Sequence, residues 1–165
     1  MNEDLKAKAA KIKLLLTDVD GVLTDTGVYY SEAGEVMKRF SIRDGMGVER
    51  LRKCCGIETG IVTGETSGSV VKRAEKLHIT ELHLGIKDKA SLLAVILERN
   101  GLLPEEIAFI GDDVNDIGII QLAGLTACPA DAMPQVTALV HYHCQQKGGE
   151  GAFREFAEWL IAFRT

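Results

Sequence analysis

Residues Leu14–Thr24 read LLLTDVDGVLT, an apolar run that ends in two carboxylates separated by one residue. The apolar run is typical of a buried parallel strand, so Asp18 and Asp20 lie at its carboxyl end, where open α/β sheets bind ligands. Bringing two carboxylates together costs free energy, because they repel each other and lose solvation. This cost is recovered if a divalent cation binds between them, or if one is a nucleophile and the other its acid–base partner. The alternative is an ordinary Asp20-Gly21 turn.

A second acidic strand end lies far downstream, where Ile107–Asp116 read IAFIGDDVND. An apolar strand is again followed by a glycine and by acids, here Asp112, Asp113 and Asp116. Acids that two strand ends bring to one edge of a sheet predict a site with oxygen ligands for a hard cation, and Mg²⁺ suits such a site. An EF-hand is excluded, because the glycine after Asp20 comes too early and no glutamate occupies the last loop position.

Two further segments lie between the acidic strand ends. The strand expected over 57–62 ends at Thr63-Gly64-Glu65, and a hydroxyl with free backbone N–H groups at a helix start suits a phosphate oxygen. Lys89 opens the helix expected over 88–100, where a cation opposes the helix dipole, so an anion facing it explains the lysine better than helix stability does. A plain Thr-Gly turn and an ordinary surface lysine are the alternatives for each segment taken singly.

In chain order, these four pieces resemble the motifs of the haloacid dehalogenase superfamily of phosphohydrolases. The resemblance implies that Asp18 is the nucleophile that takes the phosphoryl group, and that Asp20 protonates the leaving oxygen and then deprotonates water. It implies that Thr63 and Lys89 hold the phosphoryl oxygens. The implied Mg²⁺ ligands are Asp18, the main-chain carbonyl of Asp20, and Asp112, with Asp113 and Asp116 supporting the metal and Lys89.

No cap domain fits between these motifs. Larger members of the superfamily insert one, but here Asp18 and Thr63 are 45 residues apart, and Thr63 and Lys89 are 26 apart. Residues 27–40 contain two short β-like runs around an Ala-Gly turn, which predicts a projecting hairpin. Because an isolated hairpin is marginally stable in water, we expect its apolar residues to pack against other subunits, namely Val28, Tyr29, Tyr30, Val36, Met37 and Phe40.

The resemblance narrows to one capless branch, the phosphatases of 3-deoxy-2-keto sugar-acid phosphates in surface-polysaccharide synthesis. The matching segments are Asp18–Asp25, Lys38-x-Phe40, Arg43–Gly47 and Gly148–Glu155. Members of this branch form similar homotetramers, in which neighbouring subunits cover the active site. The resemblance therefore implies a homotetramer here. The glycines of 148–151 are typical of mobile backbone that approaches a ligand.

The choice of substrate depends on a few residues around the second motif. The main branch hydrolyses 3-deoxy-D-manno-octulosonate 8-phosphate (KDO8P), a lipopolysaccharide precursor, and commonly has arginine after the Thr/Ser-Gly of that motif. Glu65 follows Gly64 instead, and with Lys76 it resembles the variant that acts on 2-keto-3-deoxy-nononate (KDN) 9-phosphate. Arg73 suits a substrate carboxylate in either case, although a solvated helix face explains these charges equally well. We favour KDO8P, because its pathway is the commoner setting of the branch.

Composition and charge set the class of protein. At 165 residues and 46% hydrophobic, the chain fits a single domain over 1–165. A net charge of −5 argues against a nucleic-acid surface, and the sequence predicts neither a membrane span nor a signal peptide, so we expect a cytoplasmic protein. Four cysteines without Cys-x-x-Cys spacing indicate reduced thiols. For His141 and His143, ordinary histidines on a late strand are favoured over a zinc pair.

The expected fold is α/β, a doubly wound and mainly parallel sheet of the Rossmann-like type with a protruding hairpin. The expected strands cover 12–17, 57–62, 81–84, 107–110, 124–128 and 138–143. The expected helices cover 44–54, 67–78, 88–100, 115–122 and 152–163. Two other functions are considered. A phosphoacceptor receiver domain is disfavoured by Asp20 as a proton shuttle, and an idle tetramerisation module by the retention of Asp18, Asp20, Thr63, Lys89 and Asp112.

Overall fold

The computed structural model describes residues 3–164. Within these residues the centre is a six-stranded parallel sheet with the strand order β5-β4-β1-β6-β7-β8. The strands are β1 (Leu14–Thr17), β4 (Glu58–Val62), β5 (Glu81–His83), β6 (Ile107–Ile110), β7 (Leu125–Cys128) and β8 (Tyr142–His143). The first strand lies in the middle of the sheet and later strands add on both sides of it, so the expected doubly wound α/β fold is confirmed.

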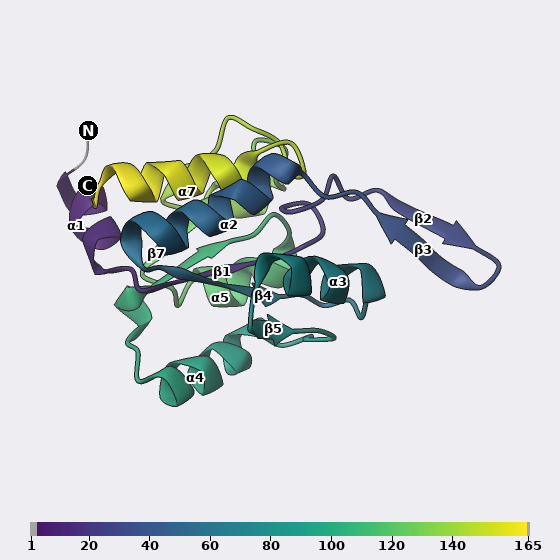
Figure 1. Cartoon of the computed structure of the whole chain (residues 1–165). Helices are drawn as coiled ribbons and strands as arrows, with labels where there is room; N and C mark the ends of the chain where they lie inside the picture. Colours follow the sequence, from purple (N-terminus) through teal and green to yellow (C-terminus); the bar gives the residue numbers. More distant parts are fainter. Residues whose placement is uncertain (1–2, 165) are drawn as a thin grey trace.

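Helices cover both faces of the sheet (Figure 1). They are α1 (Glu3–Lys11), α2 (Ile42–Cys55), α3 (Gly68–Leu77), α4 (Lys89–Asn100), η1 (Pro104–Glu106), η2 (Val114–Asp116), α5 (Ile117–Ile120), α6 (Pro134–Thr137) and α7 (Ala152–Ala162). Helices α2 and α7 pack side by side over one face, and α4 and α5 cover the other. Leu15 of β1 joins the α2/α7 core, whereas Leu14 and Leu16 join the α4/α5 core. Burial on both faces explains why the strand reads as one apolar run.

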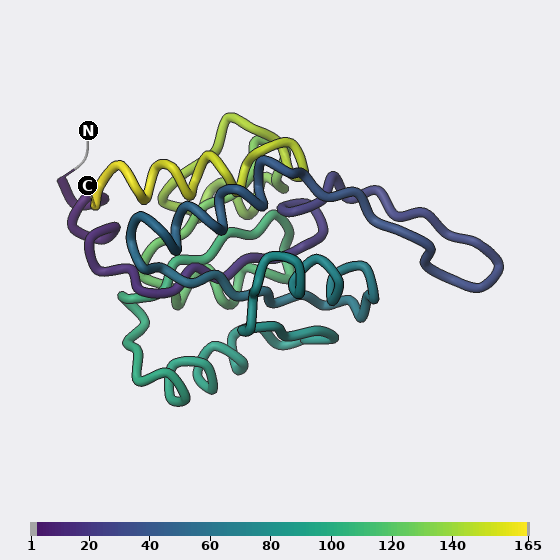
Figure 2. Tube along the Cα trace, in the orientation of Figure 1, coloured from purple at the N-terminus to yellow at the C-terminus, as the bar shows by residue number. Residues whose placement is uncertain are grey.

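The expected hairpin is present between β1 and α2. It consists of β2 (Val28–Ser31) paired antiparallel with β3 (Gly34–Lys38), and it projects away from the sheet (Figure 2). Tyr29 and Tyr30 are 62% and 71% exposed, and Val36 and Met37 are also exposed. Phe40 corrects the expectation for this segment, because it packs against the α2/α7 core of its own chain.

The ends of the chain differ most from the expected elements. The last strand is shorter than 138–143, because the chain is still turning after α6, with the Leu139 N–H donating to the Val136 carbonyl at 2.9 Å. Helix α1 was not expected, since it buries only Ala9 and has no apolar periodicity to reveal it. Among the described residues, no helix has the length and apolar character needed to cross a membrane.

Candidate active site

The carboxyl ends of β1, β4 and β6 lie next to one another, because these strands are neighbours in the sheet. A cavity of about 310 Å³ opens there. It is lined by residues from these strand ends and from the segment leading into the hairpin, namely Asp18, Asp20, Thr26, Val28, Thr63, Gly64, Glu65, Asp112, Asp113 and Asn115. All of these except Thr26, Val28 and Asn115 are residues that the sequence placed at the site.

Asp18 is the first residue after β1 and is buried. Its Oδ1 accepts a hydrogen bond from the Val19 N–H at 2.7 Å, and its Oδ2 lies 2.9 Å from Lys89 Nζ. Burial first, and then Asp116, raise the pKa of Asp18, while Lys89 acts in the opposite direction. Asp18 is therefore held in one orientation at the cavity wall, as a nucleophile requires.

Lys89 lies at the first position of α4, and its side chain is 1% exposed. Its Nζ contacts two carboxylates, at 2.9 Å from Asp18 Oδ2 and 2.6 Å from Asp116 Oδ1. Burial disfavours the cation, but these two carboxylates outweigh burial and raise the pKa of Lys89. The anion expected opposite Lys89 is thus a pair of carboxylates, and the lysine stays charged beside Asp18.

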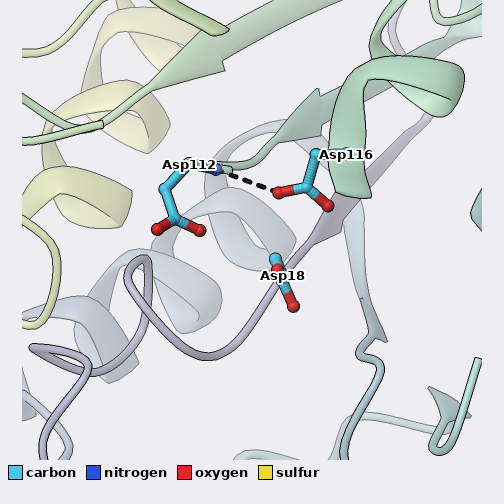
Figure 3. Close-up of side chains that lie close together, drawn as sticks. All are labelled: Asp18, Asp112 and Asp116. Carbon is cyan, nitrogen blue, oxygen red and sulfur yellow. Dashed lines mark hydrogen bonds between the residues drawn. The ribbon is translucent and has the colours of Figure 1, made fainter. Parts of the chain in front are cut away.

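Asp18, Asp112 and Asp116 form an acidic cluster, with one oxygen of each within 4.8 Å of the others (Figure 3). Asp116 is already bonded, because its Oδ2 accepts the Asp112 N–H at 3.0 Å and its Oδ1 accepts from Lys89. Asp112 Oδ1 is buried and has no hydrogen-bond partner among the described residues. Burial, followed by Asp18, Asp116 and Asp113, raises the pKa of Asp112 to about 8. A divalent cation held by Asp18 and Asp112 would satisfy that oxygen and offset the repulsion, so the donor set fits Mg²⁺.

Two glycine positions bring the site loops into close contact. Gly21 has a φ of +84°, and a Cβ there would lie 2.0 Å from Asp112 Oδ2, so only glycine allows this carboxylate to approach the loop after Asp20. A Cβ on Gly148 would lie 1.9 Å from the Gly21 carbonyl oxygen, and the Gly149 N–H donates to the Val22 carbonyl at 2.9 Å. Residues 148–149 therefore pack against residues 20–24, the loop after Asp18 that is called the catalytic loop below, which corrects the expectation of mobile backbone that approaches a ligand.

Thr63 is buried directly after β4, and its backbone is fixed on both sides. Its N–H donates to the His83 carbonyl at 3.0 Å, and its carbonyl accepts the Ile86 N–H at 3.0 Å. The Thr63 hydroxyl oxygen accepts the Glu65 N–H at 3.4 Å. The hydroxyl proton stays available as a donor to an oxygen in the cavity.

Lys38, at the end of β3, contacts a site residue, although the sequence placed it only in the hairpin and gave it no role at the site. Its Nζ lies 2.7 Å from both carboxylate oxygens of Asp20. Thr24 Oγ1 also donates to Asp20 Oδ1 at 3.4 Å. The Lys38-x-Phe40 match was the only sequence signal for this lysine, and it gives no indication of a contact with Asp20.

Arg73 and Lys76 are not among the described residues that line the cavity. Arg73 Nη2 donates to the Ser41 carbonyl at 2.7 Å, and its guanidinium lies 5.7 Å from the centre of the Phe40 ring. Arg73 therefore fixes the segment before α2 within this chain, and its expected role on a substrate carboxylate stays a prediction. Lys76 is exposed in the last turn of α3, whereas Glu65 precedes that helix, so one chain does not bring the two together.

Two other predicted residues have local partners. Asp113 lines the cavity and caps η2, where its Oδ1 accepts the Val114 N–H at 2.6 Å. His141 Nδ1 accepts the Thr126 N–H at 3.1 Å, and His143 is exposed. The acidic cluster is the sole group of three or more candidate metal ligands in the described part of the chain.

Comparisons with known proteins agree with this geometry. A family model described as haloacid dehalogenase-like hydrolase matches residues 69–155. The chain is 37% identical over 161 residues to 3-deoxy-D-manno-octulosonate 8-phosphate phosphatase KdsC of Escherichia coli (strain K12), which covers 98% of this chain and 85% of the relative.

Two solved structures of similar proteins carry ligands. The Moraxella catarrhalis 3-deoxy-D-manno-octulosonate 8-phosphate phosphatase in complex with magnesium ion, phosphate ion and KDO has a TM-score of 0.94 and 32% identity, covering 99% of this chain and 94% of that one. The cobalt-bound phosphatase from Haemophilus influenzae has a TM-score of 0.92 and 33% identity, covering 95% and 91%. The fold, the acidic cluster and these matches together show that the chain belongs to the haloacid dehalogenase-like hydrolase family.

Proposed function

We propose that this protein is a metal-dependent phosphatase that works through an aspartyl phosphate at Asp18. The observation that carries the proposal is a buried Asp18 carboxylate at a cavity, bonded to Lys89 and clustered with Asp112, whose buried Oδ1 has no hydrogen-bond partner within residues 3–164. Phosphoryl transfer depends mainly on positioning and on charge neutralisation, and this arrangement supplies both. The relatives named above are phosphatases, which supports the same reaction.

The reaction takes two steps. In the first, an Asp18 carboxylate oxygen attacks phosphorus, the bond from phosphorus to the substrate oxygen breaks, and Asp20 gives its proton to that leaving oxygen. In the second, a water oxygen attacks phosphorus, Asp20 takes a proton from the water, and the bond to Asp18 breaks. Phosphate is released and the Asp18 carboxylate is restored. Thr63 and Lys89 hold the other phosphoryl oxygens during both steps.

We assign Mg²⁺ as the cofactor, held by Asp18, Asp112 and the main-chain carbonyl of Asp20. When bound, the ion neutralises charge on the phosphoryl oxygens. The buried oxygen of Asp112 and the raised pKa of its carboxyl support a cation at this position. Asp116 supports the site indirectly, because it accepts hydrogen bonds from Lys89 and from the Asp112 N–H. The magnesium-bound and cobalt-bound relatives support a divalent metal.

KDO8P is the proposed substrate. The relatives that match nearly the whole chain carry this substrate in their names. KDN 9-phosphate is the second candidate, because Glu65 lines the cavity at the position where the main branch commonly has arginine. Both molecules are 3-deoxy-2-keto sugar-acid phosphates, so the two candidates share one reaction and differ in the part of the sugar acid that must be recognised.

We propose a homotetramer in which the hairpins of neighbouring subunits roof the cavity. The support is the apolar surface of the hairpin, where Tyr29, Tyr30, Val36 and Met37 are exposed on a segment that projects from the sheet (Figure 2). Such side chains gain free energy when another surface buries them.

Phosphate release from KDO8P and KDN 9-phosphate, measured side by side with Mg²⁺ and with chelator, tests the proposal. We expect many turnovers of KDO8P that require Mg²⁺, and none from the Asp18→Asn variant. Incorporation of one phosphate per chain without turnover would indicate a receiver-type phosphoacceptor, and no reaction with either compound would favour the tetramerisation module. Faster turnover of KDN 9-phosphate would reassign the substrate and keep the mechanism.

A further inference from the structure

The contact between Lys38 and Asp20 joins the hairpin to the catalytic loop. Lys38 Nζ lies 2.7 Å from Asp20 Oδ1 and 2.7 Å from Oδ2. The lysine side chain is 1% exposed, whereas the Asp20 side chain is 27% exposed and lines the cavity. The cation thus approaches from the protein side and leaves Asp20 facing the space where a substrate would bind.

Strand β3 also contacts the segment between Thr63 and α3, on the other side of the site. Glu35, three residues before Lys38 on β3, accepts a hydrogen bond from the hydroxyl of Ser67. Ser67 is buried at the N-cap of α3, on the segment that continues from Thr63. Glu35 Oε2 lies 3.8 Å from Lys38 Nζ, so Ser67, Glu35, Lys38 and Asp20 form a connected chain of polar contacts.

An exposed ion pair in the same segment shows how different this contact is. Arg39, the next residue, pairs with Asp25 at 2.8 Å, but the two side chains are 53% and 36% exposed. Exposed pairs of this kind contribute little to stability. Lys38 instead gives up its hydration and makes a two-point contact with a single carboxylate, which restricts the orientation of that carboxylate.

We propose that Lys38 is a positioning residue that holds Asp20 at the orientation needed to transfer a proton to the leaving oxygen. The inference rests on the proposed phosphatase function. In the first step Asp20 carries a proton on one oxygen and accepts from Lys38 Nζ through the other, and the bond from phosphorus to the leaving oxygen breaks as that proton moves to the leaving oxygen. An alkoxide leaves poorly without this proton, whereas a nitrophenolate leaves without it. Loss of the Asp20 position therefore slows the reaction of a sugar phosphate far more than that of an aryl phosphate.

The test compares kcat/KM for KDO8P and for 4-nitrophenyl phosphate in the Lys38→Met and Lys38→Arg variants, with saturating Mg²⁺. The ratio kcat/KM reports steps up to the first irreversible one, which is phosphoryl transfer to Asp18. For Lys38→Met we expect a loss of about a hundredfold with KDO8P, the scale of a misplaced catalytic group, and a loss of only a few fold with the aryl phosphate. Lys38→Arg keeps a cation near Asp20 and is expected to recover part of the loss.

The matched control is Arg39→Met, which removes the neighbouring cation and its exposed pair. It is expected to leave kcat/KM unchanged for both KDO8P and 4-nitrophenyl phosphate. Equal losses on both substrates in folded Lys38→Met would overturn the inference, because a general disturbance of the hairpin has no preference for the leaving group. If Lys38→Met does not fold by circular dichroism, Lys38→Gln takes its place, because it also removes the cation, and equal losses on both substrates in folded Lys38→Gln would overturn the inference. Wild-type protein that hydrolyses neither phosphate would refute the proposed function itself.

Discussion

The acidic cluster and the hairpin meet at one cavity but are built in opposite ways. Asp18 directly follows the central strand β1, Asp116 is the last residue of η2, and both are buried and bonded to Lys89. The hairpin projects from the sheet (Figures 1 and 2). Its Tyr29 and Tyr30 side chains are largely exposed. The main fold therefore fixes the groups that the proposed mechanism uses, while the exposed side chains of the hairpin carry the proposed assembly. Lys38 is the point where the hairpin also touches the reacting groups.

Removing the nucleophile should have the largest effect. Asp18→Asn keeps the shape of the side chain but replaces the carboxylate with a poor nucleophile and a weak metal ligand, so we expect kcat to fall on the order of 10⁴-fold or more. Steady-state phosphate release measures this, with circular dichroism as the control for folding. Activity within tenfold of wild type, in protein checked for contaminating phosphatase, would show that the acidic cluster does not carry the chemistry.

Metal removal should be nearly as severe. Chelation should inactivate the enzyme and Mg²⁺ should restore it, while Ca²⁺ should inhibit because its longer and looser coordination misplaces the phosphoryl group. Binding should also stabilise the fold, by about 2.7 kcal/mol at a Mg²⁺ concentration of 100 times Kd. Thermal unfolding with and without Mg²⁺ checks this independently of activity. Full activity after metal analysis confirmed complete removal would argue against the assignment.

The Glu65→Arg substitution tests recognition rather than chemistry. If Glu65 contacts the sugar acid, the ratio of kcat/KM for KDO8P to that for KDN 9-phosphate should change about ten- to hundredfold, the worth of one polar contact. Hydrolysis of 4-nitrophenyl phosphate serves as the control and should change little. A change in the ratio of less than about twofold would place Glu65 on a solvated surface.

Polar replacement of the hairpin surface should weaken assembly and leave the reaction intact. With Tyr29, Val36 and Met37 changed to serine, we expect species smaller than a tetramer in light scattering, and a KM for KDO8P raised about tenfold by loss of the neighbouring roof. The kcat for 4-nitrophenyl phosphate should stay close to wild type. A wild-type monomer that is fully active at nanomolar concentration would contradict the proposal that the hairpin forms a tetramer and roofs the cavity.

Asp44, where the hairpin segment joins α2, should affect only stability. Burial raises its pKa from 3.8 to about 6, and its Oδ2 is buried without a hydrogen-bond partner among the described residues. Because folding favours the neutral carboxyl, the contribution of Asp44 to stability is fully present below about pH 4 and is lost as pH rises through about 6, by at most about 3 kcal/mol. Denaturant unfolding should show that Asp44→Asn removes this part of the slope, and an unchanged slope would contradict it.

Residues at strand ends were predictable because their signal is local. An apolar run followed at once by acids shows where a buried strand stops, and parallel strands then bring Asp18 and Asp112 to one edge. The contact of Lys89 with carboxylates was also predictable, because a cation at the start of a helix requires a reason outside the helix.

Contacts that depend on how a segment folds back on the rest of the chain were not predictable. The contact of Lys38 with Asp20 depends on how the hairpin leaves the sheet, and the spacing of the two residues does not report it. The contacts of Arg73 with the Ser41 carbonyl and the Phe40 ring likewise depend on how the segment before α2 folds back, and the position of Arg73 on its helix does not report them. Short elements such as β8 and α6 carry too few residues to show a period.

The packing of residues 148–149 on the catalytic loop has a consequence for synthesis on the ribosome. Gly149 donates to the Val22 carbonyl, and Gly148 lies against the Gly21 carbonyl oxygen. The loop that follows Asp18 is thus synthesised well before residues 148–149, which form one of its walls. A nascent chain that has already paired β1 with β4 and β6 still lacks this support, so the catalytic loop acquires its final shape only after the C-terminal segment emerges.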